Sequence, residues 1–200
     1  MTRAVLEQRL AETVRASPRL MRVLEAARAL ALPDWRIVSG AVYQTVWNAL
    51  TGRDPDYGIK DYDLFYFDGS DLSYEAEDQV IRRAAAAFAP DLTALVEARN
   101  QARVHLWFAA RFGEPYSPLH CSDEALERFV CPAFGVGVRL EADGRIDIAA
   151  PFGLDDLFAM RLRPNPRRSL STGWAPVTAG VAARWPELTI SEPAAGVAGA

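Results

Sequence analysis

The chain has few cysteines and no long apolar run. Cys121 and Cys131 are too few to form a disulfide scaffold, and we expect both to be free thiols. No segment approaches the ~20 consecutive apolar residues that a membrane-spanning helix needs. The first residues alternate Arg and Glu with Leu and lack the apolar core of a signal peptide. We therefore expect a cytoplasmic protein without a membrane partner.

Lysine is almost absent, and acidic residues outnumber basic ones, 26 to 22. The formal net charge is −4, and Lys60 is the only lysine. Proteins that coat DNA or RNA non-specifically neutralise many phosphates with Lys and Arg, so this charge balance argues against that class. Apolar residues, by contrast, are abundant: half of the sequence is hydrophobic and 24% is charged. This composition is typical of a compact domain with a substantial core, and we expect one domain over residues 1–185.

The spacing of apolar residues predicts a helical N-terminal extension over residues 3–31. Leu6, Leu10 and Val14 recur at the interval that places them on one face of a helix. Pro18 is favoured at the first position of a helix, so a second helix is expected to begin there.

Over residues 35–168 the pattern alternates between strand and helix. It predicts a strand at 35–38, a helix at 40–50, a strand at 62–67, a helix at 73–88, a strand at 92–98, a short helix at 122–130, a hairpin of strands 134–140 and 145–149, and a helix from 154 that stops before Pro164. This order predicts an α/β (α+β) fold with a central mixed sheet and flanking helices. Residues 186–200 lack periodicity, and we expect a mobile tail there.

Two carboxylates stand at the start of the strand predicted at 62–67. Asp61 and Asp63 are two residues apart, so their side chains are expected on the same face of the sheet. Carboxylate oxygens are the ligands that Mg²⁺ and Mn²⁺ prefer. The rest of the strand is apolar, and adjacent negative charges at the edge of a core are costly without a cation. The sequence therefore predicts a divalent-metal site at Asp61 and Asp63.

A phosphate-binding element is expected nearby. The first strand runs into Ser39 and Gly40, and a helix follows at once. Backbone N–H groups at the N-terminus of a helix suit a phosphate, and glycine lets the phosphate approach closely. Metal and triphosphate are then expected in one cleft.

The strings VSGAVYQTVWNALTGR and KDYDLFYF resemble the nucleotidyltransferase superfamily of DNA polymerase beta, in the style of the CCA-adding enzymes. The chain also resembles a bacterial family of predicted nucleotidyltransferases that share the strings VEARNQARVHLWF and PFGLDDLFAMRLRPNP. Together the likeness covers about Trp35 to Arg168. Two departures stand out: Ala41 occupies the second small position after Gly40, and residues 41–60 make a longer spacer before Asp61 than many members have.

This resemblance implies a nucleotidyltransferase fold and an enzyme that moves an NMP from an NTP to a hydroxyl with release of pyrophosphate, using Mg²⁺ or Mn²⁺. It also implies a third acid. Glu97 is the first choice, because superfamily members usually place this acid between apolar residues on a neighbouring strand. Asp147 lies in the same local pattern and is the alternative. Glu97 can equally pair with Arg99 along its strand.

Several donors surround Glu97. We expect Arg99 and Arg103 to contact phosphate, because the planar guanidinium fits phosphate oxygens, and Asn100 to orient substrate. Lys60 directly precedes Asp61 and can reach the same cleft.

Two further groups have a plainer explanation. The cluster of Arg161, Arg163, Arg167 and Arg168 can receive an anionic substrate, but such a cluster is most often a solvated face. Trp107 and Phe108 fit a core better than a platform for stacking a base, and His105 fits a structural hydrogen-bonding role.

The acceptor of the transferred group is not fixed by these residues. An acidic chain of this size offers little basic surface for a tRNA, so a small molecule or a protein side chain is favoured over RNA. Two other functions stay open: a catalytically silent nucleotide-binding module, and a partner-binding scaffold built on the same fold.

Overall fold

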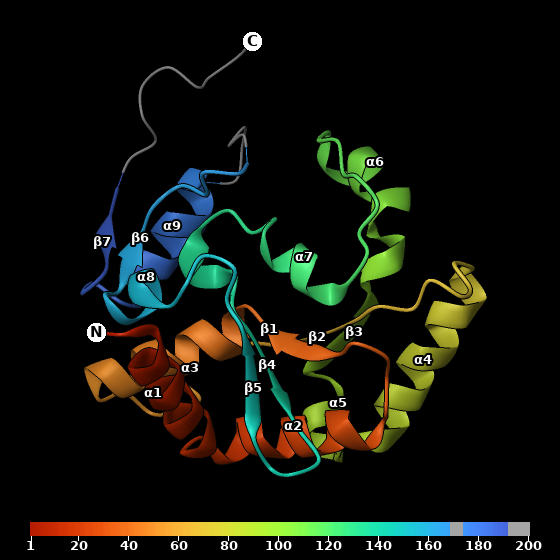
Figure 1. The fold of residues 1–200 in the computed structure, drawn as a ribbon, viewed down its shortest axis with the longest axis horizontal. Coiled ribbons are helices and arrows are strands. Elements are labelled where there is room, and N and C mark those ends of the chain that lie inside the picture. Colours follow the sequence, from red (N-terminus) through yellow and green to blue (C-terminus); the bar gives the residue numbers. More distant parts are fainter. Residues whose placement is uncertain (169–173, 192–200) are drawn as a thin grey trace.

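A five-stranded sheet lies at the centre of the computed structural model, which describes residues 1–168 and 174–191 (Figure 1). The strand order is β3-β2-β1-β4-β5. The strands are β1 (Arg36–Val38), β2 (Tyr62–Tyr66), β3 (Val96–Asn100), β4 (Gly137–Leu140) and β5 (Ile146–Ala149). β2 and β3 are parallel and the other neighbours are antiparallel. The predicted mixed sheet is therefore confirmed.

Helices cover both sides of this sheet. They are α1 (Arg3–Arg15), α2 (Pro18–Ala29), α3 (Gly40–Thr51), α4 (Tyr74–Ala87), α5 (Pro90–Thr93), η1 (Gln101–Leu106), α6 (Phe108–Phe112), α7 (Ser122–Leu126), η2 (Pro132–Phe134), α8 (Asp155–Phe158) and α9 (Trp174–Ala182). In the view of Figure 1, α2 and α5 lie below the sheet, and α6, α7 and α9 lie above it. A small second sheet pairs β6 (Arg161–Leu162) with β7 (Thr189–Ile190).

The two predicted N-terminal helices are confirmed. Leu6, Leu10 and Val14 of α1 are at most 2% exposed, and α2 begins at Pro18. Both helices contribute to the main hydrophobic core. Apolar side chains at helical spacing therefore hold the extension on the domain.

The two faces of β2 have different surroundings. Tyr62, Leu64 and Tyr66 are at most 1% exposed and belong to the main core. Asp63 and Phe65 are half-buried and belong to the opposite face, because successive residues of a strand alternate. The functional residues predicted on β2 therefore share the face that lacks the main core.

A second, smaller core covers part of this opposite face. Val38, Leu126 and Ala149 are buried in it, and Phe65 and Phe129 pack against it. It joins β1, β2 and β5 to α7 and the chain that follows α7. The acidic start of β2 lies beyond these residues on the same face.

Four element boundaries differ from the prediction. The strand predicted at 134–140 starts at Gly137, because residues 132–134 form η2. Residues 90–93 form α5, so β3 starts at Val96 and not at residue 92. The helix predicted at 122–130 ends at Leu126. The helix predicted to approach Pro164 ends at Phe158, because Met160 takes a positive φ of 49° that interrupts a right-handed helix before β6.

The C-terminal region contains more structure than predicted. Helix α9 and the strand pair β6–β7 have no counterpart in the periodicity analysis. Thr189 and Ile190 pair with β6, although they lie in the segment 186–200 that was expected to be irregular. The rest of the predicted tail, residues 192–200, lies outside the described residues.

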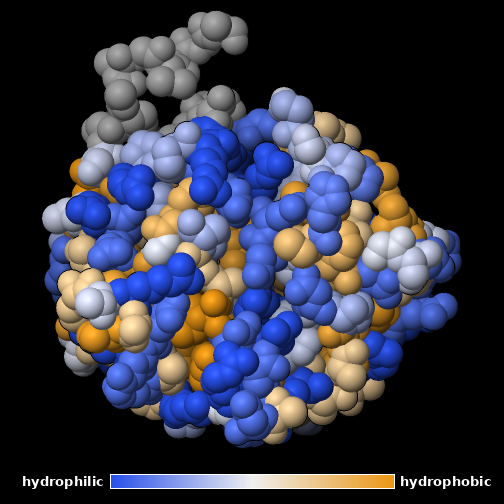
Figure 2. Space-filling view, viewed as in Figure 1, coloured by the Kyte–Doolittle hydropathy of each residue, from blue (hydrophilic) through white to orange (hydrophobic). Residues whose placement is uncertain are grey.

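The molecular surface in Figure 2 is mainly hydrophilic, with hydrophobic residues scattered over it. Within residues 1–168 and 174–191, no helix is both long enough and apolar enough to cross a membrane. Cys121 and Cys131 are free, as predicted.

Arg36 joins three elements on the face of the sheet that carries Asp63 and Phe65, called the upper face below. This β1 residue is 6% exposed and forms ion pairs with Asp123 of α7 and, at 2.9 Å, with Asp147 of β5. Burial opposes the charge of Arg36, but the two carboxylates outweigh burial and raise its pKa. The ion pairs therefore fix α7 and the hairpin on the sheet.

We predict that Arg36→Met lowers the free energy of unfolding by about 1–3 kcal/mol, because Asp123 loses its ion pair and Asp147 keeps only Arg139 and Arg145. Urea denaturation measures the change. Arg145→Met is the matched control: Arg145 pairs with the same Asp147 at 3.1 Å, but its side chain is 60% exposed. The control should cost at most about 1 kcal/mol. Equal losses in the two variants would show that the buried ion pairs do not hold these elements together.

Candidate functional site

The predicted acid pair lies at the edge of the upper face of the sheet. Asp61 is exposed and directly precedes β2, and Asp63 is the second residue of that strand and is half-buried. Glu97 of β3 is in register with Asp63, since the two strands run parallel. The three carboxylates predicted as metal ligands are therefore neighbours on adjacent strands.

These charges act on one another. Burial, followed by the negative charges of Asp61 and Glu97, raises the pKa of Asp63 to about 7, and Arg99 opposes the rise. A cation at this place would relieve the repulsion between the carboxylates. The donor set, which is carboxylate oxygen throughout, fits a hard divalent cation.

Glu97 has a competing partner. Its Oε2 accepts a hydrogen bond from Nη2 of Arg99 at 3.2 Å, so the pairing considered from the sequence is present. In the part of the chain that the structure describes, no group of three or more His, Cys, Asp or Glu side chains is arranged to hold a metal ion. Arg99 and a cation would therefore compete for the negative charge of Glu97.

Asp147, the alternative third acid, has a different role. It lies on β5, at the other edge of the sheet from Glu97, and it binds Arg36, Arg139 and Arg145. Burial raises the pKa of Asp147, but the hydrogen bonds from Arg145 and Arg36 outweigh this and lower it. The structure thus gives Asp147 a structural role within an arginine network in place of the predicted metal contact.

The turn at Ser39 brings the start of α3 beside the acids. Ser39 has φ 58° and ψ −125°, a conformation that side chains disfavour, and its carbonyl accepts from the N–H of Val42 and Tyr43. A Cβ atom placed on Gly40 would lie 3.0 Å from Gln44 Nε2 and 4.0 Å from Asp61 Oδ1. The backbone at Gly40 therefore borders the acid pair, as the phosphate-binding prediction requires.

This geometry also explains the departure at Ala41. The strained backbone position is Ser39, before Gly40, and Ala41 is 1% exposed in the main core. Ser39 and Gly40 therefore form the turn, and Ala41 already belongs to the buried part of α3.

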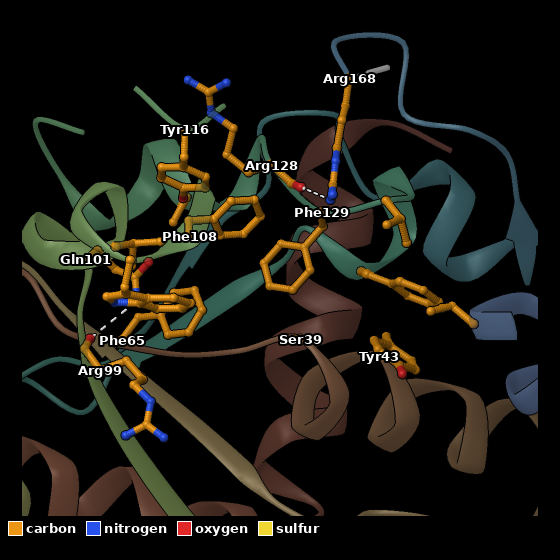
Figure 3. A pocket seen from close by; sticks show the side chains of 16 residues that line it. Ser39, Tyr43, Phe65, Arg99, Gln101, Phe108, Tyr116, Arg128, Phe129 and Arg168 are labelled. Carbon is orange, nitrogen blue, oxygen red and sulfur yellow. Dashed lines mark hydrogen bonds between the residues drawn. The ribbon is translucent and has the colours of Figure 1, made fainter. Parts of the chain in front are cut away.

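A cavity of about 410 Å³ opens on the same face of the sheet (Figure 3). Ser39, Phe65 and Arg99 line it, and they are sequence neighbours of Gly40, Asp63 and Glu97. Aromatic rings form much of its wall: Tyr43, Phe65, Trp107, Phe108, Tyr116, Phe129 and Phe134. The cavity therefore borders the strands that carry the acids, although Asp61, Asp63 and Glu97 are not among its lining residues.

Comparison with known proteins identifies the family and the fold. A sequence profile of the family described as Nucleotidyltransferase matches residues 25–190. The chain belongs to this nucleotidyltransferase family. A solved NMR structure, described as revealing a CCA-adding enzyme head domain, has a TM-score of 0.74 and 24% sequence identity, covering 93% of this chain and 96% of that chain. This likeness shows the nucleotidyltransferase fold. A comparison with curated proteins gives no match.

The long spacer before the acid pair of this nucleotidyltransferase is held by the C-terminal region. Arg184 donates to the carbonyl of Gly58 at 2.8 Å, and Nε1 of Trp185 donates to Oδ1 of Asn48 at 3.1 Å. Asn48 in turn donates to two carbonyls of the spacer, at residues 55 and 57. Sequence reasoning missed Arg184 and Trp185, because no local motif connects them to a loop so distant in sequence.

Two residues predicted to contact substrate make contacts within the chain. Oδ1 of Asn100 accepts from the N–H of Asp68 at 3.0 Å, and its Nδ2 donates to the carbonyl of the same residue at 2.9 Å. Arg103 forms an ion pair with Glu77 and donates to the carbonyl of Leu72 at 2.9 Å. Both side chains therefore form their polar contacts within the protein, and neither lines the cavity.

The other predicted donors lie closer to the site. Arg99 lines the cavity, and Lys60 is exposed directly before Asp61, with no ion pair among the described residues. Their contacts with phosphate stay predictions.

The predicted location of two aromatic residues was wrong. Trp107 and Phe108, expected in the core, are half-buried on the cavity wall, where the Phe108 ring lies 4.6 Å from the Tyr116 ring. The buried Nδ1 of His105, expected to form hydrogen bonds, has no hydrogen-bond partner among the described residues. The adjacent rings at 107 and 108 were the signal for a cavity wall in the sequence.

The C-terminal arginine cluster is mostly structural. Arg161 and Arg163 both pair with the buried Asp156, at 2.5 and 2.7 Å. Arg167 pairs with Glu127 at 2.6 Å. Arg168 is the member that reaches the cavity.

We predict that Asp63→Asn stabilises the metal-free protein by about 2 kcal/mol at about pH 8 and has little effect at about pH 4. An unperturbed Asp titrates near ~3.9, whereas the pKa of Asp63 is about 7. A raised folded-state pKa favours folding at low pH, and this contribution is lost as the pH rises from about 4 to about 7. Urea denaturation in EDTA at several pH values measures the effect.

The exposed Glu25 on α2 provides the control for this experiment. Glu25→Gln should leave the pH dependence of the wild-type protein unchanged. If Asp63→Asn also leaves it unchanged, the buried charge at Asp63 does not destabilise the fold.

Proposed function

We propose that this protein transfers a nucleoside monophosphate from an NTP to a hydroxyl group of an acceptor, releasing pyrophosphate, with Mg²⁺ or Mn²⁺ as cofactor. The observation that carries the proposal is the close approach of Gly40 at the start of α3 to Asp61. This approach supports the proposal because backbone N–H groups at the start of α3 suit a phosphate and Asp61 suits a cation, and the neighbouring Ser39 lines the cavity.

Each residue has a distinct part in this proposal. Asp61 and Asp63 bind the cation, and Glu97 completes its site. When bound, the cation supplies positive charge to the phosphates and to the charge that develops during transfer. The backbone at Gly40 orients the triphosphate, and Lys60 and Arg99 donate to its oxygens. The chain thus acts by positioning and electrostatics.

The acceptor is a small molecule or a protein side chain in preference to RNA. The cavity is of a size that suits a small molecule. The formal charge of −4 gives little support for binding a polyanion. We keep the cytoplasm as the predicted location.

One observation favours a second candidate function, a catalytically silent nucleotide-binding module. Glu97 pairs with Arg99, and the three carboxylates do not converge. A site that keeps only Asp61 and Asp63 can hold a nucleotide with its cation and yet fail to complete the transfer.

Calorimetric titration of ATP, CTP, GTP and UTP with Mg²⁺ or Mn²⁺ tests both candidates. We expect at least one NTP to bind only with the cation, and Asp63→Asn and Glu97→Gln to weaken that binding by about tenfold or more. Glu25→Gln should bind as the wild-type protein does. Pyrophosphate release in the presence of an acceptor would establish the transferase.

The outcomes separate the candidates. Binding that survives in Asp63→Asn would show that the acid pair does not hold the nucleotide and its cation. Metal-dependent binding without pyrophosphate, across an acceptor screen, would favour the silent module. If no NTP binds with either cation, the fold stands and a partner-binding scaffold becomes the better explanation.

A further inference from the structure

The cavity carries positive charge at the end that lies away from Ser39. Arg99, Arg128 and Arg168 are among its lining residues, and in the described chain no Asp or Glu lines it. In Figure 3, Arg128 and Arg168 lie at one end, and Ser39 and Tyr43 lie at the other. The cavity therefore runs from Ser39, the residue before Gly40, at one end to two arginines at the other.

Flat apolar surfaces connect these two ends. Phe65 and Phe129 have nearly parallel rings, with 15° between their planes and 6.3 Å between their centroids. The rings of Phe108 and Tyr116 lie at the side of the same space. Such walls bind planar or apolar groups and contribute little to binding a polyphosphate.

The two distal arginines differ in how far they are already neutralised. Arg168 pairs with Glu114 at 2.7 Å. The guanidinium of Arg128 lies over the ring of Tyr116, 5.5 Å from its centroid, and has no ion pair with a described carboxylate. Arg128 therefore retains charge and donors for an anionic ligand.

An NTP alone does not explain this charge distribution. Its phosphates are expected at the end with Gly40 and the acids, where a cation can offset them. Its base is neutral and needs no arginine at the far end. A ligand with its own anionic group at that end matches the arginines better.

We propose that the cavity binds the acceptor, and that the acceptor is a small molecule with a planar apolar body, an anionic group bound by Arg128 and Arg168, and a hydroxyl directed toward Asp61 and Asp63. This inference rests on the proposed nucleotidyl transfer. In that transfer the hydroxyl oxygen forms a bond to the α-phosphorus of the NTP. The bond from that phosphorus to the bridging oxygen of the β-phosphate breaks, pyrophosphate leaves with the electron pair, and the hydroxyl proton passes to solvent.

Three related compounds test the chemistry of the site without relying on turnover. The first, para-hydroxyphenylpropionate, has the ring, the hydroxyl and the anionic group. The second, para-ethylphenol, lacks the anionic group, and the third, phenylpropionate, lacks the hydroxyl. Calorimetry gives the dissociation constant of each compound, with and without ATP and Mg²⁺.

Arg128→Gln is the test variant and Arg111→Gln is its control, since Arg111 is exposed on nearby α6 and does not line the cavity. We expect Arg128→Gln to weaken the binding of para-hydroxyphenylpropionate and of phenylpropionate by about tenfold or more. The binding of para-ethylphenol should not change. Arg111→Gln should bind all three compounds as the wild-type protein does. Metal-dependent binding of ATP should be the same in both variants.

Other outcomes overturn the inference without deciding the proposed function. If neither acid binds at millimolar concentration, or if both bind Arg128→Gln as well as wild type, the cavity does not select an anionic acceptor. If ATP with Mg²⁺ displaces the acid, the cavity holds the nucleobase instead. Failure of the proposed nucleotidyl transfer is recognised separately, because no pyrophosphate is then released from any NTP, whether or not the two carboxylate compounds bind.

Discussion

The burial of one face of β2 determines where the functional residues lie. Tyr62, Leu64 and Tyr66 are packed in the main core, and a shift of one residue would expose them and bury Asp63. The direction of Asp63 is therefore set by the hydrophobic effect acting on its neighbours. Parallel pairing with β3 then places Glu97 beside it. An unfavourable cluster of charges is thus maintained by the stability of the surrounding core.

The sequence predicted the parts of the fold that rest on local periodicity. The stripe of α1, the start of α2 at Pro18 and the acids of β2 were all found from spacing, and the resemblance supplied the fold. Boundaries failed where a single residue interrupts a pattern, as Met160 does with its positive φ. Helix α9 was missed because it contains Pro and Gly, and its packing on the rest of the chain is tertiary.

The candidate site was predictable in its acids and less so in its donors. Asp61, Asp63 and Gly40 lie together because one strand and one helix N-terminus carry them. Asn and Arg are common in substrate contacts, yet Asn100 hydrogen-bonds to the backbone of Asp68 and Arg103 forms an ion pair with Glu77. Composition cannot separate the two roles, because an arginine near a carboxylate fits either one. The cavity escaped prediction because its wall is assembled from segments distant in sequence.

The contact of Arg184 with Gly58 spans 126 positions of the chain. During synthesis on the ribosome, Asp61 and Asp63 leave the exit tunnel long before Arg184 and Trp185 are made. The core strands β1 and β2 can pair at that stage, but the spacer that leads into the acids has not yet gained the hydrogen bond from Arg184. The approach to the acid pair is therefore completed late in biogenesis, after the hydrophobic framework around it has formed.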